Sequence, residues 1–137
     1  MSNILPNALA RKVKAAILSQ FPEWDRYVQI QNDGDIEIEV PAPKGSSAGN
    51  LIILTAKGSD IWIRYGPAYM SYAVDGEIEL INITKQLLSE EASFVVILEN
   101  ETWTETTLVK SGQTPTLKPG QTARVVSWLG TYDRGVA

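Results

Sequence analysis

The acidic side chains are the groups of this chain best suited to chemistry, because the sequence contains no histidine and no cysteine. Without those residue types there can be no Ser-His-Asp triad, no cysteine nucleophile and none of the common zinc sites. Carboxylate, lysine or tyrosine chemistry remains, together with an oxygen-ligand site for a hard cation such as Mg²⁺ or Ca²⁺. The composition therefore favours a non-catalytic function, with no cofactor and no catalytic residue.

An acidic row occupies residues 35–40, where acidic and apolar residues alternate strictly. Successive side chains of a β-strand point to opposite faces of the sheet. Asp35, Glu37 and Glu39 are therefore expected on one face of a strand whose other face packs into the core. A row of carboxylates on an exposed face is available to a partner.

The turn before this strand holds Asn32, Asp33 and Asp35, which superficially resemble a calcium-binding loop. The spacing does not follow the EF-hand pattern, and no acidic residue stands at the end that such a loop requires. The three residues are expected to shape a turn, and no metal site is predicted.

The densest aromatic stretch runs from residue 60 to residue 74 and is interrupted by a Gly-Pro pair at 66–67. Alternation along its strand places Trp62 and Arg64 on the less buried face. Aromatic residues and arginine are enriched among the side chains that anchor interfaces. The predicted partner-binding surface combines the acidic row with this stretch: Asp35, Glu37, Glu39, Trp62, Arg64, Tyr69 and Tyr72.

Hydrophobic periodicity predicts two helices and seven strands. Apolar residues recur every fourth position over residues 6–20, with Asn3 as a possible cap, and a broad apolar face follows Asp75, the expected cap of a helix that ends near Glu90. The strands are expected over residues 26–31, 35–40, 51–56, 61–65, 93–98, 102–109 and 122–128, and residues 130–137 are expected to form a loosely held tail. The inward positions predict a core of Leu9, Val13, Ile17, Val28, Ile30, Ile36, Ile38, Leu51, Ile53, Ile63, Ile81, Leu88, Val95, Ile97 and Val125.

The order of these elements is α-β-β-β-β-α-β-β-β, which predicts an α+β fold. Short turns between consecutive strands favour antiparallel pairing. The 137 residues are expected to form a single domain, residues 1–137, in which one antiparallel sheet of about seven strands packs against two α-helices.

The charge pattern bears on partners and location. The formal net charge is −4, and the middle of the chain is acidic, whereas a nucleic-acid groove needs clustered Lys and Arg. A basic protein partner is compatible with this charge. The sequence has no apolar run long enough to cross a bilayer and no signal-peptide pattern at its start, so a cytoplasmic location without membrane or nucleic-acid binding is expected.

Residues 32–39, the segment Ile61-Trp62-Ile63-Arg64-Tyr65 and the acidic second helix together resemble the small acidic α+β immunity proteins of bacterial toxin systems. The resemblance covers the layout of most of the chain. It implies a cytoplasmic protein that is not an enzyme and that neutralises a toxin by binding its basic domain through acidic and aromatic side chains.

Two other functions stay open. A sheet and a helix could enclose a small-molecule or catalytic pocket lined by Tyr65, Tyr69, Tyr72 and Trp103, with Glu105 beside Trp103 as the buried acid. Alternatively, the chain could be a homo-oligomeric structural protein that pairs through the free edge of the Thr-rich strand at residues 102–109.

Overall fold

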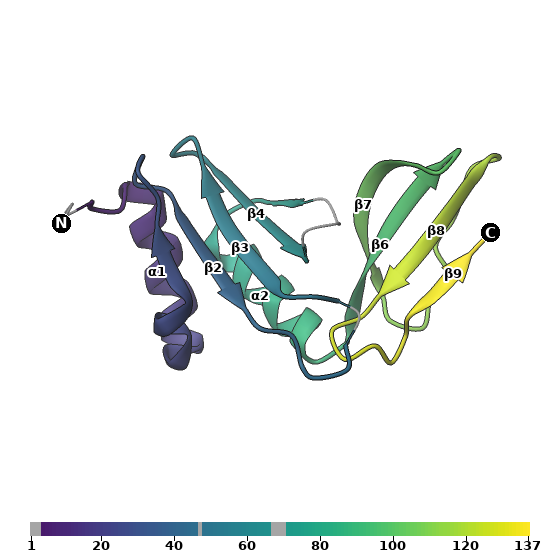
Figure 1. Cartoon of the computed structure of the whole chain (residues 1–137), viewed down its shortest axis with the longest axis horizontal. Coiled ribbons are helices and arrows are strands. Elements are labelled where there is room, and N and C mark those ends of the chain that lie inside the picture. The colour runs from purple at the N-terminus through teal and green to yellow at the C-terminus, as the bar shows by residue number, and fades with distance from the viewer. Residues whose placement is uncertain (1–3, 47, 67–70) are drawn as a thin grey trace.

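The chain folds into two antiparallel sheets and two α-helices, in a computed structural model that describes residues 4–46, 48–66 and 71–137 (Figure 1). The helices are α1 (Ala8–Gln20) and α2 (Glu77–Leu88), with a 3-10 helix, η1 (Pro22–Tyr27), after α1. The first sheet contains β1 (Val28–Ile30), β2 (Ile36–Val40), β3 (Leu51–Ala56), β4 (Asp60–Tyr65) and β5 (Tyr72–Val74). The second sheet contains β6 (Ala92–Glu99), β7 (Thr102–Lys110), β8 (Gln121–Val126) and β9 (Arg134–Val136).

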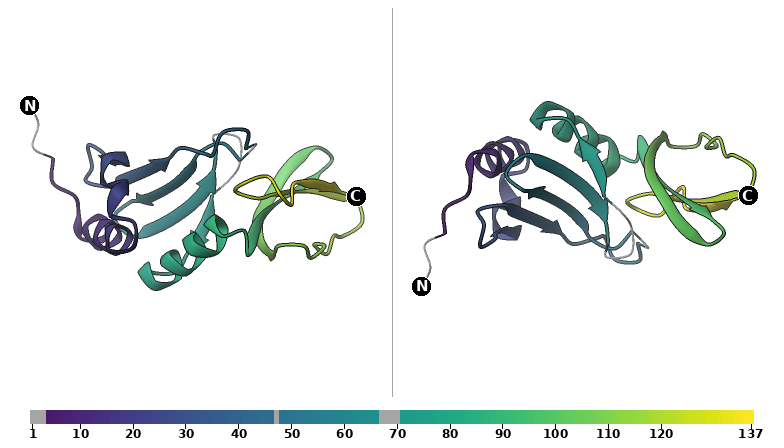
Figure 2. Two further views of the ribbon diagram at one scale, coloured as in Figure 1. Left: turned by 90° about the horizontal axis from the view of Figure 1, so that it is seen from below. Right: turned by 90° about the horizontal axis from the view of Figure 1, so that it is seen from above.

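The first sheet is a meander in the order β1-β2-β3-β4-β5, and α1 and α2 both cover the same face of it (Figure 2). Alternation in β2 points Ile36 and Ile38 toward the helices, and both side chains are fully buried. The helices contribute their apolar stripes, including Val13 and Leu80. Burying each such side chain contributes about 1.5–3 kcal/mol, so this interface forms the main core.

The second sheet has the order β7-β6-β8-β9 and a smaller apolar cluster of its own. Four buried residues form that cluster: Val95, Ile97, Ala123 and Val125. Partly buried side chains pack against it, among them Leu117 from the loop before β8 and Val136 from β9. The opposite face of β6 contributes Phe94 to the main core, so this strand of the second sheet packs into both apolar clusters and links them.

An aromatic junction joins the two sheets. The Tyr65 ring at the end of β4 meets the Phe94 ring edge-on, with centroids 4.8 Å apart, and lies 5.7 Å from the Trp128 ring. The Ser46 hydroxyl donates a 2.6 Å hydrogen bond to the Trp128 carbonyl. Tyr65 is completely buried, so this contact belongs to the core and not to a surface.

Two glycines beside the junction bring backbone against backbone. A Cβ added to Gly49 would lie 2.9 Å from the Gly66 Cα atom, closer than Cβ atoms approach other atoms in proteins. Both residues have a positive φ, 72° for Gly49 and 53° for Gly66, which side chains disfavour. The loop before β3 and the end of β4 can pack together only because neither residue carries a side chain.

The α+β class is confirmed, but the single seven-stranded sheet is wrong. All seven predicted strands exist, and they are divided between two sheets with β5 and β9 added. Hydrophobic alternation identifies a strand without identifying its partner, and α2 separates β5 from β6 along the chain. The predicted tail is also wrong, since β9 pairs with β8 and places Val136 opposite Ala123.

The ends of the helices differ from the predictions. Asn7 caps α1, with its Oδ1 atom accepting from Ala10 N at 2.9 Å, whereas Asn3 lies outside the described residues. Gly76 precedes α2 in place of Asp75, which instead donates its backbone N–H to Glu79. Neither α-helix of the described segments, at 13 and 12 residues, has the length and apolar character needed to cross a membrane.

Residues 26–31 form less strand than predicted. Arg26 and Tyr27 belong to η1, and only Val28–Ile30 pairs with β2. Pro22 opens η1, and the Phe21 and Trp24 rings stack with centroids 4.2 Å apart. This aromatic pair stabilises the 3-10 helix, so β1 begins only at Val28.

Candidate functional site

The face of the first sheet that lies opposite the α-helices includes six side chains from three neighbouring strands, and we call these six residues the outer face. The register places Glu37 opposite Leu54 and Leu54 opposite Trp62. It also aligns Glu39, Ile52 and Arg64. Directly opposite residues point to the same face of a sheet, so these six residues form one surface. Neither α-helix lies on this side (Figure 2).

The centre of the outer face is apolar. Leu54 and Trp62 are half-buried, and together with Ala56 and Ser71 they line a shallow hollow. A second hollow adjoins it, lined in part by Leu54, Glu37 and Arg64. Half-buried aromatic and aliphatic side chains next to a depression are the usual anchors of a protein interface.

Carboxylates border this centre. Glu39 is exposed and accepts a 2.7 Å hydrogen bond from the Asn50 side chain, which holds the carboxylate in place. Glu37 is half-buried and has no hydrogen-bond or ion-pair partner within the described residues. Its carboxylate therefore retains its full capacity to accept hydrogen bonds from a basic group.

Arg64 supplies a positive charge on the same face. The residue is half-buried, and its Nε atom is buried without a hydrogen-bond partner in the described part of the chain. A buried donor that lacks a partner costs about 1–3 kcal/mol. The outer face therefore combines two carboxylates, one guanidinium and an apolar centre.

Asp35 does not belong to this surface, so the predicted row of three carboxylates is wrong. Its Oδ1 atom accepts hydrogen bonds from Asn7 Nδ2 at 2.9 Å, Thr55 Oγ1 at 3.0 Å and Gly58 N at 3.2 Å. The residue precedes β2, which begins at Ile36, so the alternation of the strand does not govern its direction. Asp35 is buried and joins the start of α1 to the turn between β3 and β4.

The environment of Asp35 lowers its pKa. Burial alone would raise the pKa of this carboxyl, but hydrogen bonds from Asn7, Thr55 and the Gly58 amide outweigh burial and hold it below its ordinary value. Glu90 behaves in the same way: burial raises its pKa, and hydrogen bonds from the segment after β8, chiefly from Thr131, lower it further than burial raises it. Both acids stabilise the fold in their ionised form.

The predicted tyrosines do not join the outer face. Tyr72 pairs with Ile63, whose side chain faces the helices, and its ring packs 6.3 Å from the Phe94 ring. Tyr69 lies outside the described residues. The structure therefore brings together Glu37, Glu39, Trp62 and Arg64 out of the seven predicted residues, and it separates Asp35 and Tyr72 from them.

Leu54 and Ile52 are residues of this face that the sequence did not reveal. The run at residues 51–56 is continuously apolar, so alternation could not distinguish its two faces. The turn between β3 and β4 carries the missing signal, because it pairs Ala56 with Asp60 and thereby Leu54 with Trp62. Only the hairpin register assigns the two residues to the outer face.

The proposed aromatic pocket does not form as predicted. Tyr65 is fully buried in the core, and Trp103 lies on β7 in the other sheet. A bulge at Ile97 and Leu98 places Glu105 opposite Ile97 and Trp103 opposite Leu98, so Trp103 and Glu105 point to opposite faces. Glu105 is exposed, whereas a catalytic acid would need burial to raise its pKa.

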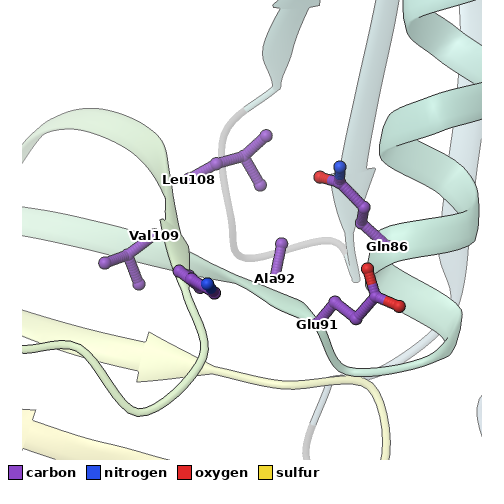
Figure 3. A pocket seen from close by; sticks show the side chains of 6 residues that line it. Gln86, Glu91, Ala92, Leu108 and Val109 are labelled. Carbon is purple, nitrogen blue, oxygen red and sulfur yellow. The ribbon is translucent and has the colours of Figure 1, made fainter.

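A hollow does exist where α2 approaches β6 and β7 (Figure 3). Gln86, Ala92 and Leu108 point toward its space from three elements. Glu91 and Lys110 at its border are exposed and thus remain solvated. None of the aromatic residues predicted to line a pocket belongs to its lining: Gln86, Glu91, Ala92, Leu108, Val109 and Lys110.

The residues of the turn before β2 have their oxygens turned to protein donors. Asp33 Oδ1 accepts from the Asp35 backbone N–H at 3.0 Å, and Asp35 Oδ1 is occupied by three donors. Within the described segments, no group of three or more acidic side chains is placed to hold a metal ion. The turn is therefore built from hydrogen bonds internal to the protein.

Millimolar Ca²⁺ or Mg²⁺ is expected to leave the melting temperature unchanged, because an ion that does not bind the native state cannot stabilise it. Differential scanning fluorimetry with each ion, and with Na⁺ at matched ionic strength as the control, measures this. A saturable rise in melting temperature that disappears in Asp33→Asn would show that a site exists.

No protein-family model, curated protein or solved structure matches this chain. The outer face therefore carries the functional proposal through its own geometry: a half-buried Leu54 and Trp62 centre, two bordering carboxylates and an unpaired arginine nitrogen.

Proposed function

We propose that this chain is a non-catalytic protein-binding module that binds a basic protein partner through the outer face. One observation carries the proposal: an apolar centre of Leu54 and Trp62 lies beside Glu37, Glu39 and Arg64 on the side of the sheet opposite both α-helices (Figure 2). Sheets whose one face is helix-covered present the other face to solvent or to a partner.

The two kinds of side chain have different tasks in this proposal. Trp62 and Leu54 supply the apolar contact area that slows dissociation once a partner is bound. Glu37 and Glu39, on a chain of net charge −4, attract a basic surface and accelerate its encounter. The Arg64 guanidinium can donate hydrogen bonds to a carboxylate of the partner at one defined position.

The resemblance of residues 32–39 and 61–65 to immunity proteins supports a toxin domain as the basic partner, and with it a cytoplasmic location. Neutralisation in this proposal is steric, since the bound module covers the toxin without altering it chemically. Binding without a chemical reaction is consistent with a site that has no buried acid, histidine or cysteine.

Replacing Glu37 and Glu39 together by glutamine is expected to slow association and to weaken its dependence on salt, because the charges act at long range and salt screens them. Trp62→Ala is expected mainly to speed dissociation. The partner is first captured from the native host with the parent chain as bait, and its rates are then measured by surface plasmon resonance at low and physiological salt.

A matched control replaces Glu99 and Glu101, two exposed acids at the turn between β6 and β7, by glutamine. It removes the same charge at a distance from the outer face and should retain the parent's dissociation rate and most of its association rate. Rates that are unchanged in both the Glu37/Glu39 and Trp62 variants, with all proteins shown to be folded by circular dichroism, would eliminate the outer face as the binding site.

A further inference from the structure

The edges of the two sheets differ in length. Three of the four edge strands, β1, β5 and β9, have only three residues each, whereas β7 has nine (Figure 1). Short edge strands are one of the ways in which proteins prevent unwanted strand pairing. A long edge presents a continuous row of backbone N–H and C=O groups, so β7 is the edge of the described chain best suited to accept another strand.

The composition of β7 favours such pairing. Four of its nine residues are threonine, it contains no proline, and its only charges are Glu105 and Lys110. Threonine has a high preference for strands, and proline would have removed a backbone donor. The bulge at Ile97 and Leu98 leaves a regular segment, residues 105–110, which pairs one to one with residues 92–97 of β6.

We infer that β7 pairs antiparallel with β7 of a second copy of this chain. The β7-β6-β8-β9 sheets of the two copies then form one continuous sheet across a twofold axis. In a symmetric antiparallel pair the axis passes through a residue that faces its own copy, because only then do opposite side chains point to the same face. The residue at the axis therefore decides the register.

Charge selects among the possible registers. An axis at Glu105 would place two carboxylates opposite each other, which is destabilising. An axis at Thr107 places Thr107 opposite itself, Thr106 opposite Leu108 and Glu105 opposite Val109, so no charge meets a like charge. This register pairs residues 105–109, five of the six residues of the regular segment. An axis at Leu108 would pair five of them as well, but it uses only residues 106–110 of β7, whereas the axis at Thr107 uses residues 104–110.

The dimer contact and the outer face are independent surfaces. The outer face belongs to β2, β3 and β4, whereas β7 belongs to the second sheet. Dimerisation therefore leaves Glu37 and Trp62 available and would give one assembly two partner-binding faces. Failure of either proposal leaves the other standing.

A charge pair at the axis residue tests the inference. Thr107→Lys and Thr107→Glu should each be monomeric, because each places two like charges opposite each other, and an equal mixture of the two variants should recover the dimer. The Thr107 side chain is half-exposed and makes no hydrogen bond within the described residues, so either replacement can be accommodated without breaking one. Sedimentation velocity over a range of concentrations gives the mass of each sample.

Thr102→Lys is the matched control, since the same substitution on the same strand lies beyond the bulge and outside the paired segment. It should remain dimeric. Amide hydrogen exchange along β7 should also slow as the parent chain is concentrated. A parent that stays monomeric at its highest soluble concentration, or a dimer that survives in Thr107→Lys and in Thr107→Glu alone, would overturn the inference.

Discussion

Truncating Ile38 to alanine should lower the free energy of unfolding by about 2–5 kcal/mol, the range for removing a large aliphatic side chain from a packed core. Ile38 is fully buried and lies in the middle strand of three, opposite Val28 of β1 on one side and Ile53 of β3 on the other. The cavity cannot easily collapse, because pairing on both sides fixes the backbone around it.

Equilibrium denaturation with urea, followed by circular dichroism, measures the loss. Ile78→Ala is the matched control, since it deletes the same atoms from a side chain on α2 that is 81% exposed, and it should change stability by less than about 0.5 kcal/mol. Ile97→Ala, in the smaller cluster of the second sheet, is expected in the same range as Ile38→Ala. Variants of Ile38 and Ile97 that melt like the parent would show that the strand registers are incorrect.

Replacing Asp35 by alanine is the second change with a large expected effect. It would leave the Asn7 side chain, the Thr55 hydroxyl and the Gly58 amide without their acceptor. Thr55 is buried, and a buried donor without a partner costs about 1–3 kcal/mol, whereas Asn7 and Gly58 can be hydrated. A loss of about 1–3 kcal/mol is therefore expected. Asp35→Asn should cost less, because its amide oxygen can still accept while the charge is lost.

The pH dependence of stability separates the charge of Asp35 from its shape. The pKa of Asp35 is lower in the folded chain than in the unfolded chain, where it is near 3.9. The stabilisation is therefore fully present above about pH 4 and is lost as the pH falls through the folded pKa. Urea denaturation at several pH values between 7 and about 2 should show a shallower acid-side loss in Asp35→Asn than in the parent.

The remaining acid-side loss in that variant should come in part from Glu90, whose pKa is also lowered by hydrogen bonds. If Asp35→Asn and the parent lose stability in parallel on acidification, the carboxylate of Asp35 does not stabilise the fold in its ionised form, and its hydrogen bonds must be differently arranged.

Sequence periodicity predicted the elements of this fold well and their partners poorly. Each of the seven strands was found because alternation or apolar runs are local signals. The division into two sheets depends on which residues meet across long separations, as Phe94 of β6 meets Tyr65 of β4. Tyr65 was identified as part of the chain's densest aromatic stretch and Phe94 as part of a strand, but no local pattern states that the two rings pack together.

The candidate site shows the same limit. The sequence correctly placed four residues on one face: Glu37, Glu39, Trp62 and Arg64. Each lies inside a strand, where the alternation of side chains assigns the face. Asp35 was misplaced because the strand starts one residue later and because its donor Asn7 lies 28 positions away. Trp103 and Glu105 were wrongly expected on the same face, because a bulge in the hairpin places them on opposite faces. The sequence carries no clear mark of a bulge.

The contact between Gly49 and Gly66 has a consequence for divergence among relatives of this chain. An alanine at position 49 would press its Cβ atom against backbone, which has no rotamer with which to move away, and both positions require a positive φ. A substitution at one position cannot be compensated by a substitution at the other, so neither glycine can be replaced. The surface around Glu37 and Trp62 can change as the partner changes. Homologues that have lost all overall likeness are expected to retain this pair of glycines, one before β3 and one at the end of β4.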